Sequence, residues 1–417
     1  ALGALLQNSA AAVAASFALP AAFALLGAAS PLVSDWIDMS STWNWVLENE
    51  WAGHVPQIAF SVAFWVAIPL AARAYSALIS DPAVTALPEW IPAEKAGPKL
   101  QIRRGAVVRL LKVSKSDWKL TQLPEVEGAF VALDPRSGAI RALVGGFDYG
   151  KNKFNHVTQA WRQPGSSFKP FIYSAALERG FTPSTVVNDA PLFFDADVTG
   201  SQPWEPKNYD GKFEGPMPLM TGLAKSKNMV SIRVLQTIGP AFAQQWIQKF
   251  GFDADKHPAY LTMALGAGSV TPLQMATAYS TFANGGLHIQ PHLISRIVDG
   301  KGRVLVNSPP HDADESSRAL DARNAFVMTN LLQGVTRYGT AARAQATLKR
   351  PDIYGKTGTT NDAVDAWFAG FQAGAGSPGL VAVVWMGHGD PKSLGARESG
   401  GGLALPVWMD YMAQALK

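Results

Sequence analysis

A serine and a lysine three residues apart form the first candidate for chemistry in this sequence. The segment from Ser166 to Lys169 has the pattern S-x-x-K and follows the turn-forming pair Pro164-Gly165. A helix that begins here places the serine hydroxyl and the lysine amine on one face. A serine hydroxyl needs a base before it can act as a nucleophile, and a partly buried lysine can lose its proton and supply that base. The helix N-terminus also offers N–H groups to an oxyanion.

Two further polar patterns follow along the chain. Ser226-Lys227-Asn228 has the pattern S-x-N, which alone would indicate a helix cap or a surface stretch. The K-T-G pattern begins at Lys356 and is expected on an edge strand, where the lysine and the hydroxyls can bind a carboxylate. Glycine in such a strand permits close approach of a ligand to the backbone. The three patterns in this order are the set found in penicillin-binding proteins and class A β-lactamases.

The stretch from about 124 to 417 resembles the transpeptidase domain of class A penicillin-binding proteins of the 1A type. The resemblance rests on the three motifs and on segments such as PEVEGAFVALDPRSGAIRALVGG, PKNYDGKFEGPMPL and DAWFAGF. It implies an α/β (α+β) fold of the penicillin-binding and serine β-lactamase type, with an antiparallel sheet flanked by helices. It also implies a serine-type D-Ala-D-Ala transpeptidase that cross-links peptidoglycan stem peptides through an acyl-enzyme. The middle motif departs from the usual pattern, with Lys227 where aspartate is common.

The resemblance implies a role for each catalytic candidate. Ser166 would attack the penultimate D-Ala carbonyl, with Lys169 as the base for acylation. Ser226 would relay a proton towards the leaving group, and Asn228 would hold the substrate amide. Lys356 would support the Ser226 region and add positive charge.

The resemblance also implies a substrate-binding strand. Thr357 and Thr359 would contact the terminal carboxylate of the substrate, with Gly358 between them. The backbone N–H groups of Thr359 and of the nucleophile would form an oxyanion hole, where donors matter most as charge develops. Three aromatic residues are expected to line the substrate groove, with core packing as the alternative: Trp204, Tyr209 and Trp367.

The elements that must position these motifs follow from the hydrophobic pattern. Alternation and β-branched residues predict strands at 100–112, 118–122, 128–134, 139–145, 364–373 and 379–386. Apolar residues at helical spacing predict helices at 167–179, 219–238, 241–250, 272–284 and 322–336. This order predicts that early and late strands share one antiparallel sheet covered by helices.

The first ninety residues differ from the rest in charge. Residues 1–80 are predicted to be a hydrophobic, helical membrane-anchor region with candidate spans at 10–33 and 51–72, and two buried helices of a soluble domain are the alternative. Residues 81–98 hold four prolines and are expected to be a linker. Residues 99–123 resemble a remnant of the small β domain that precedes the transpeptidase domain at 124–417.

The charges near the candidate spans and the expected reaction indicate opposite sides of the membrane for the catalytic domain. The acidic segment 34–50 and Arg73 would place the catalytic domain in the cytoplasm. We give more weight to the chemistry and expect an inner-membrane anchor with a periplasmic catalytic domain. No glycosyltransferase-type E-D-x-x-F motif occurs in residues 1–98, so we expect no glycan polymerisation.

Composition excludes several other functions. The sequence has 417 residues, a net charge of +4 and no cysteine, which rules out disulfides and a cysteine nucleophile. No basic stripe interleaved with aromatic residues suggests nucleic acid. There is no H-E-x-x-H motif, and Pro291 interrupts the pair His288 and His292, so we expect neither a metal nor a cofactor. The expected partners are stem peptides, β-lactams, the membrane and other cell-wall synthesis proteins.

Two other functions remain open on this scaffold. One is a hydrolase, either a D,D-carboxypeptidase or a β-lactamase. A β-lactamase needs a second base that activates water for deacylation, and no E-x-x-L-N-like segment supplies one. The other is a non-catalytic β-lactam sensor, although every motif residue of an enzyme is present.

Overall fold

The computed structural model describes residues 108–114, 117–121, 124–196, 202–307, 312–373, 379–396 and 398–417. The chain divides into two units, residues 1–123 and 124–417. In the first unit, strands β1 (Arg109–Lys112) and β2 (Trp118–Thr121) form an antiparallel pair. The two candidate spans and the proline-rich linker lie outside the described residues. No helix in the described part of the chain is long and apolar enough to cross a membrane.

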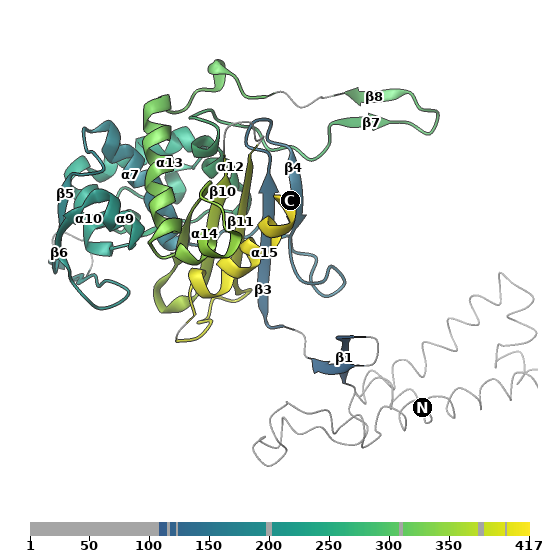
Figure 1. Cartoon of the computed structure of the whole chain (residues 1–417), viewed down its shortest axis with the longest axis horizontal. Helices are drawn as coiled ribbons and strands as arrows, with labels where there is room; N and C mark the ends of the chain where they lie inside the picture. Colours follow the sequence, from purple (N-terminus) through teal and green to yellow (C-terminus); the bar gives the residue numbers. More distant parts are fainter. Residues whose placement is uncertain are drawn as a thin grey trace, which may run out of the picture. The chain divides into compact units, whose positions relative to one another are not determined.

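The second unit is built on a five-stranded antiparallel sheet (Figure 1). Its order is β4 (Ile140–Val144), β3 (Val126–Leu133), β11 (Leu380–His388), β10 (Asp365–Gln372) and β9 (Ile353–Thr359). Early and late strands therefore share one sheet, as the sequence predicts. Strand β9, which carries the K-T-G pattern, lies at the edge.

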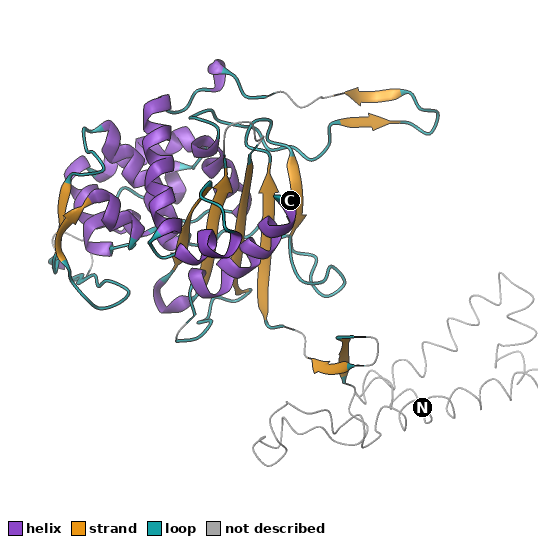
Figure 2. Cartoon of the chain, viewed as in Figure 1, coloured by secondary structure: helices purple, strands orange, loops and turns teal. Residues whose placement is uncertain are grey.

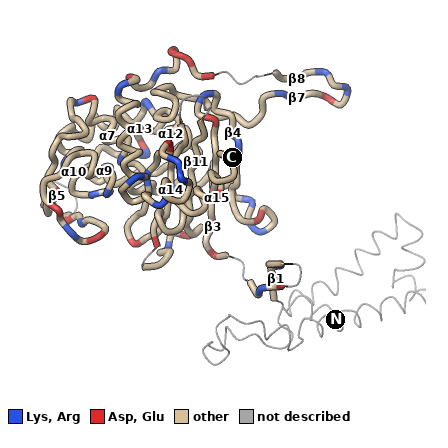
Figure 3. Tube along the Cα trace, viewed as in Figure 1, with Lys and Arg blue, Asp and Glu red and all other residues tan. Residues whose placement is uncertain are grey.

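Both faces of the sheet are covered by helices (Figure 2). Helix α12 (Pro272–Ala283) packs on β3, β10 and β11, and α15 (Leu405–Ala415) packs on β10 and β11 from the opposite face (Figure 1). All eight residues of β10 are buried, which agrees with its nearly continuous apolar sequence. Strands β10 and β11 contain no lysine or arginine, and most charged residues lie outside the sheet (Figure 3).

The remaining helices pack mainly beside β9. They are α7 (Lys169–Glu178), α9 (Leu219–Ala224), α10 (Asn228–Ile238), α11 (Pro240–Ile247), α13 (Ala322–Arg337) and α14 (Ala342–Leu348). Helix α13 contacts β9 directly and also packs on α7 and α9. The predicted helices 241–250, 272–284 and 322–336 correspond to α11, α12 and α13. Helices α14 and α15 were not predicted.

The single helix predicted at 219–238 is wrong. The structure has two helices, α9 and α10, separated by Lys225–Lys227. Ser226 in this break has a φ of +57°, a left-handed conformation that ends a helix. Helical spacing of apolar residues continues on both sides of the break, so periodicity alone does not reveal it. The break places the S-x-N motif in a turn at the start of α10.

Short elements complete the second unit. Two antiparallel pairs stand apart from the central sheet: β5 (Val186–Asp189) with β6 (Gly215–Pro218), and β7 (Arg296–Val298) with β8 (Val304–Asn307). Short helical turns are η2 (Gly165–Phe168), η3 (Gln248–Phe250), η4 (Ala254–Lys256), η5 (Leu261–Leu265), η6 (Glu315–Ser317), η7 (Asn361–Ala363) and η8 (Gly400–Ala404).

Candidate active site

The S-x-x-K motif begins in a tight helical turn. Residues 165–168 form η2, and the α-helix proper starts only at Lys169, two residues later than predicted. With three residues per turn, Ser166 and Lys169 still lie on the same side. Ser166 is half-buried, whereas Lys169 is fully buried.

A buried aromatic contact anchors this turn. Phe168 is fully buried, and its ring stacks on His257 with the centroids 4.7 Å apart. Burial lowers the pKa of His257 to about 4, so the imidazole is neutral at pH 7 and packs as an apolar ring. The hydroxyl of Ser167 also donates to Pro164 O at 2.6 Å. The two residues that follow Ser166 are therefore fixed by buried contacts, and these contacts position the nucleophile candidate.

Glycines allow the turn to lie directly against the edge strand. Gly165 has a φ of +55°, and a Cβ atom there would lie 2.5 Å from Thr359 O. A Cβ on Gly358 would lie 2.5 Å from Pro164 O and 2.8 Å from the Ser167 hydroxyl. The expectation that Gly358 makes room for a ligand thus needs a correction. On the side where a Cβ would stand, its small size makes room for the nucleophile turn.

Lys169 links the first two motifs. Its Nζ donates to Ser226 O at 2.7 Å, to Asn228 Oδ1 at 2.7 Å and to Ser226 Oγ at 3.3 Å. Within the described residues, none of its hydrogen bonds reaches Ser166 Oγ. Such bonds are often long before a substrate binds and tighten only in the complex. Burial, together with the nearby charge of Lys356, holds the pKa of Lys169 well below its usual value.

Lys356 brings the third motif to the same hydroxyl. Its Nζ donates to Ser226 Oγ at 2.9 Å and to Thr357 O at 3.1 Å. Burial lowers the pKa of Lys356 to about 7. Ser226 Oγ therefore lies between two buried amines, each close enough for a hydrogen bond. This arrangement can pass a proton between the two lysines and a reacting group at the surface.

The two threonines of the edge strand have different partners. Thr357 Oγ1 is hydrogen-bonded to Thr340 Oγ1 at 2.7 Å, and Thr359 Oγ1 accepts from Gly400 N at 3.1 Å. Sequence reasoning missed Thr340, which follows α13 and belongs to no motif. Thr340 reaches Thr357 because α13 packs against β9. The two hydroxyls are thereby fixed in place along the strand.

The three aromatic candidates lie in different environments, and Trp367 is the partner of Gly358 across β10 and β9. Trp367 is fully buried and donates through Nε1 to Gln163 O, which agrees with core packing, the alternative stated for it. Trp204 is half-buried and stacks on Phe194 with the centroids 5.5 Å apart. The side chain of Tyr209 is 73% exposed. In the described part of the chain, neither Trp204 nor Tyr209 has a ring contact or hydrogen bond with the five catalytic candidates.

Comparison with known proteins agrees with the fold and the motifs. Residues 128–410 match the family described as penicillin binding protein transpeptidase domain. Penicillin-binding protein 1A of Neisseria flavescens is 50% identical over 325 residues, which cover 78% of this chain and 40% of that protein. The chain thus spans about 40% of the length of such relatives.

Two solved structures are similar in fold. Penicillin-binding protein 1A from Haemophilus influenzae has a TM-score of 0.69 and 39% identity, covering 74% of this chain and 50% of that one. PonA1 from Mycobacterium tuberculosis, solved in complex with penicillin V, has a TM-score of 0.59 and 28% identity over 71% of this chain and 79% of that one. The chain belongs to the family of penicillin-binding protein transpeptidase domains.

Proposed function

We propose that the chain is a serine-type D-Ala-D-Ala transpeptidase that cross-links peptidoglycan stem peptides through an acyl-enzyme on Ser166. The observation that carries this proposal is the position of Ser226 Oγ between the amines of Lys169 and Lys356, at 3.3 and 2.9 Å. This hydroxyl connects the base of the nucleophile to the strand that would hold the substrate. Each of the three motifs thus contributes to one proton path.

Acylation begins with removal of the Ser166 proton. Because burial keeps the pKa of Lys169 low, its amine is available as a neutral base. Ser166 Oγ then attacks the penultimate D-Ala carbonyl carbon, and the oxyanion lies between the N–H groups of Ser166 and Thr359. The C–N bond breaks, and the proton moves from Lys169 through Ser226 to the departing D-Ala amine. An ester on Ser166 remains.

Deacylation repeats these steps in reverse with a new amine. The amine of an acceptor stem peptide loses a proton to Lys169 through Ser226 and attacks the ester carbonyl. A peptide cross-link forms, and the proton returns to Ser166 Oγ. Asn228, whose Oδ1 accepts a hydrogen bond from Lys169 as Ser226 does, holds the donor peptide amide.

The edge strand binds the donor carboxylate. The Thr357 and Thr359 hydroxyls sit on β9, and the buried amine of Lys356 donates to the backbone carbonyl of Thr357. A carboxylate at this strand favours the protonated form of Lys356, whose pKa is near 7 without it. Substrate binding thereby increases the positive charge that faces it. Gly358 keeps this strand against the nucleophile turn, while Trp204 and Tyr209 would contact more distant parts of the peptide.

The same chemistry extends to inhibitors and to cellular location. A β-lactam would acylate Ser166 as the donor peptide does, and the relative PonA1 has been solved with penicillin V. We propose the following arrangement of the chain: a membrane-anchor region at 1–80, a linker at 81–98, a small β remnant at 99–123 and a periplasmic transpeptidase domain at 124–417. Stem peptides occur outside the inner membrane, which supports that location.

A hydrolase on this scaffold is the competing function. In the described residues, the hydrogen bonds of Lys169, Ser226 and Lys356 all go to hydroxyls, carbonyls or an amide, and none goes to a carboxylate. A second base for water is therefore not among their partners. This argues against a β-lactamase and leaves a D,D-carboxypeptidase to the test below.

The test supplies a donor and an acceptor together. The full chain is incubated with a stem pentapeptide ending in D-Ala-D-Ala and with a free D-amino acid, and the products are identified by mass spectrometry. Exchange of the terminal D-Ala for the added amino acid is expected, and Ser166→Ala should abolish it. Tetrapeptide alone would indicate a carboxypeptidase. No product together with no acyl-enzyme would refute the proposal.

A further inference from the structure

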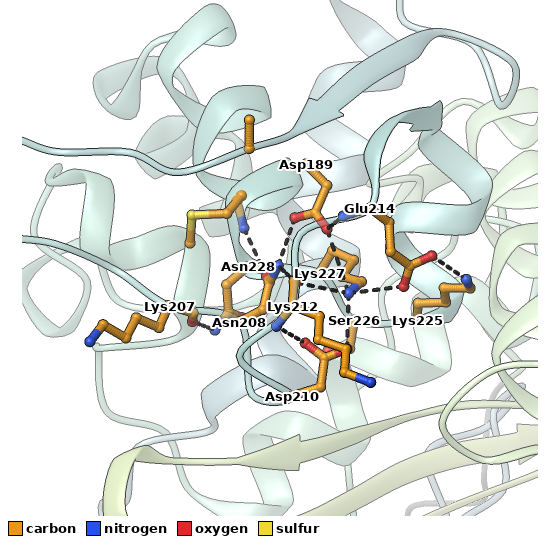
Figure 4. A network of polar contacts seen from close by, with 12 residues as sticks. Asp189, Lys207, Asn208, Asp210, Lys212, Glu214, Lys225, Ser226, Lys227 and Asn228 are labelled. Carbon is orange, nitrogen blue, oxygen red and sulfur yellow. Dashed lines mark hydrogen bonds and ion pairs between the residues drawn. The ribbon is translucent and has the colours of Figure 1, made fainter.

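Lys227, the middle residue of the S-x-N motif, is buried among carboxylates (Figure 4). Its side chain is 3% exposed, and its Nζ lies 3.5 Å from Asp189, 3.0 Å from Asp210 and 3.0 Å from Glu214. Its Nζ also donates to Lys212 O at 3.3 Å. A buried ammonium is costly unless it is paired in this way. Lys227 is thus a buried and paired charge directly after Ser226.

The acidic pocket is itself rigidly built. Asp189, at the end of β5, is fully buried and accepts from Asn208 Nδ2 at 2.7 Å and from Glu214 N at 2.9 Å. The Oδ1 atom of Asn208 accepts from Asn228 N at 2.8 Å, at the first residue of α10 (Figure 4). The segment 207–214 therefore holds both residues that follow Ser226.

This anchoring explains the unusual backbone of Ser226. A left-handed conformation is unfavourable for a serine, yet Ser226 has a φ of +57°. Lys227 N donates to Gly222 O at 2.9 Å, so the backbone is also tied on the helix side. With Lys227 and Asn228 both fixed, the turn can keep Ser226 Oγ between the two catalytic lysines.

We propose that Lys227 is a positioning residue: its ion pairs with Asp189, Asp210 and Glu214 hold the S-x-N turn in the geometry that acylation requires. This inference rests on the function proposed above. Lys227 has a second effect, because it neutralises a buried carboxylate close to the base. The charges that act on Lys169 are Lys356 from β9, which lowers its pKa, and Asp189 from β5, which raises it.

The pH dependence of acylation reports on this second effect. Acylation needs neutral Lys169, so its rate rises as pH increases through the pKa of that amine. In Lys227→Met, the positive charge 3.5 Å from Asp189 is gone, while Asp189 keeps its donors Asn208 and Glu214. Its field then raises the pKa of Lys169, and the rising limb of the pH profile moves up by about one pH unit.

The experiment compares Lys227→Met with Lys225→Met in the full chain. Lys225 is two residues earlier, half-exposed and paired with Glu214, so its loss controls for removal of a nearby charge. The rate of acylation by benzylpenicillin is measured by mass spectrometry from pH 5 to 10. Lys227→Met should lower the rate about 10- to 100-fold, as misplaced catalytic groups do, and shift the profile. Lys225→Met should do neither.

Two further variants complete the test. Lys227→Arg keeps the charge and should restore most of the rate. Asp210→Asn removes one partner of Lys227 on the exposed side of the pocket, and it should lower the rate severalfold even if Lys227→Met fails to fold. Wild-type rate and pH profile in both Lys227→Met and Asp210→Asn would overturn the inference. Absence of acylation in the wild-type chain would instead overturn the proposed function.

Discussion

A methyl group on Gly165 should separate Ser166, the proposed nucleophile, from the edge strand. Gly165 has a φ of +55°, and a Cβ atom would lie 2.5 Å from the carbonyl oxygen of Thr359 and 2.8 Å from its carbonyl carbon. Both are backbone atoms, so no side-chain rotation relieves the contact. The turn with Ser166 must move away from β9, and the proposed oxyanion hole must widen.

The size of the effect has two parts. A left-handed alanine costs about 1 kcal/mol, and forced separation of a packed contact costs about 1–3 kcal/mol more. Gly165→Ala should therefore lower the free energy of unfolding by about 2–4 kcal/mol, which lowers Tm by about 3–7 °C for a domain of this size. A displacement of about 1 Å at the nucleophile costs about 100-fold in rate.

Gly180 offers a matched control. It follows α7 and has a φ of +88°, and no atom lies within 4 Å of the position that a Cβ would take there. Gly180→Ala should thus lose about 1 kcal/mol of unfolding free energy through backbone strain alone, because the added Cβ touches no atom. Its rate of acylation should equal that of wild type. The assays are thermal unfolding and the rate of acylation by benzylpenicillin. Equal stability and equal acylation rates in the two variants would refute the reasoning.

Three further predictions concern buried polar groups. Burial lowers the pKa of Lys356 in the folded chain to about 7, against 10.5 in the unfolded chain. Between these two values the unfolded chain binds the proton more readily. The free energy of unfolding therefore decreases as pH falls from 10.5 towards 7. Lys356→Met has no amine to protonate and so lacks this loss of stability. In urea titrations, the free energy of unfolding of Lys356→Met minus that of wild type should be about 2–3 kcal/mol larger at pH 6 than at pH 9. Thr340→Val removes the 2.7 Å hydrogen bond to Thr357, and benzylpenicillin should bind about fivefold more weakly in stopped-flow measurements, with a nearly unchanged acylation step. Arg162→Met breaks the buried ion pair with Asp365 at 2.7 Å and should cost about 3 kcal/mol in unfolding experiments, most of which Arg162→Met/Asp365→Asn should recover. A cost no larger than that of the double variant would contradict this last prediction.

The sequence predicts much of the sheet because its signals are local. Strands β3, β4, β10 and β11 follow runs of apolar and β-branched residues, and the turn between β3 and β4 contains Asp134 and Gly138, whose φ is +78°. The Asp134 side chain accepts from Arg136 N at 3.0 Å, as an aspartate in such a turn does. The K-T-G pattern also lies on the expected edge strand, β9.

The rest depends on contacts between distant segments. The break between α9 and α10 occurs because Asn208 and the acidic residues hold the turn around Ser226, and no apolar periodicity marks it. Thr340 belongs to no sequence motif, and nothing in the sequence indicates that Lys227 is buried among carboxylates. Burial of Trp367 likewise follows from its place in the central strand β10, which only the pairing with β9 and β11 defines.

The central claim is that Ser166 forms the acyl-enzyme. Intact-mass and peptide mass spectrometry of the full chain after exposure to benzylpenicillin test it most directly. The account predicts one adduct with the mass of the whole drug, located on Ser166, stable after the free drug is removed and absent in Ser166→Ala. An adduct on another serine, or rapid loss of the adduct with release of hydrolysed drug, would contradict it.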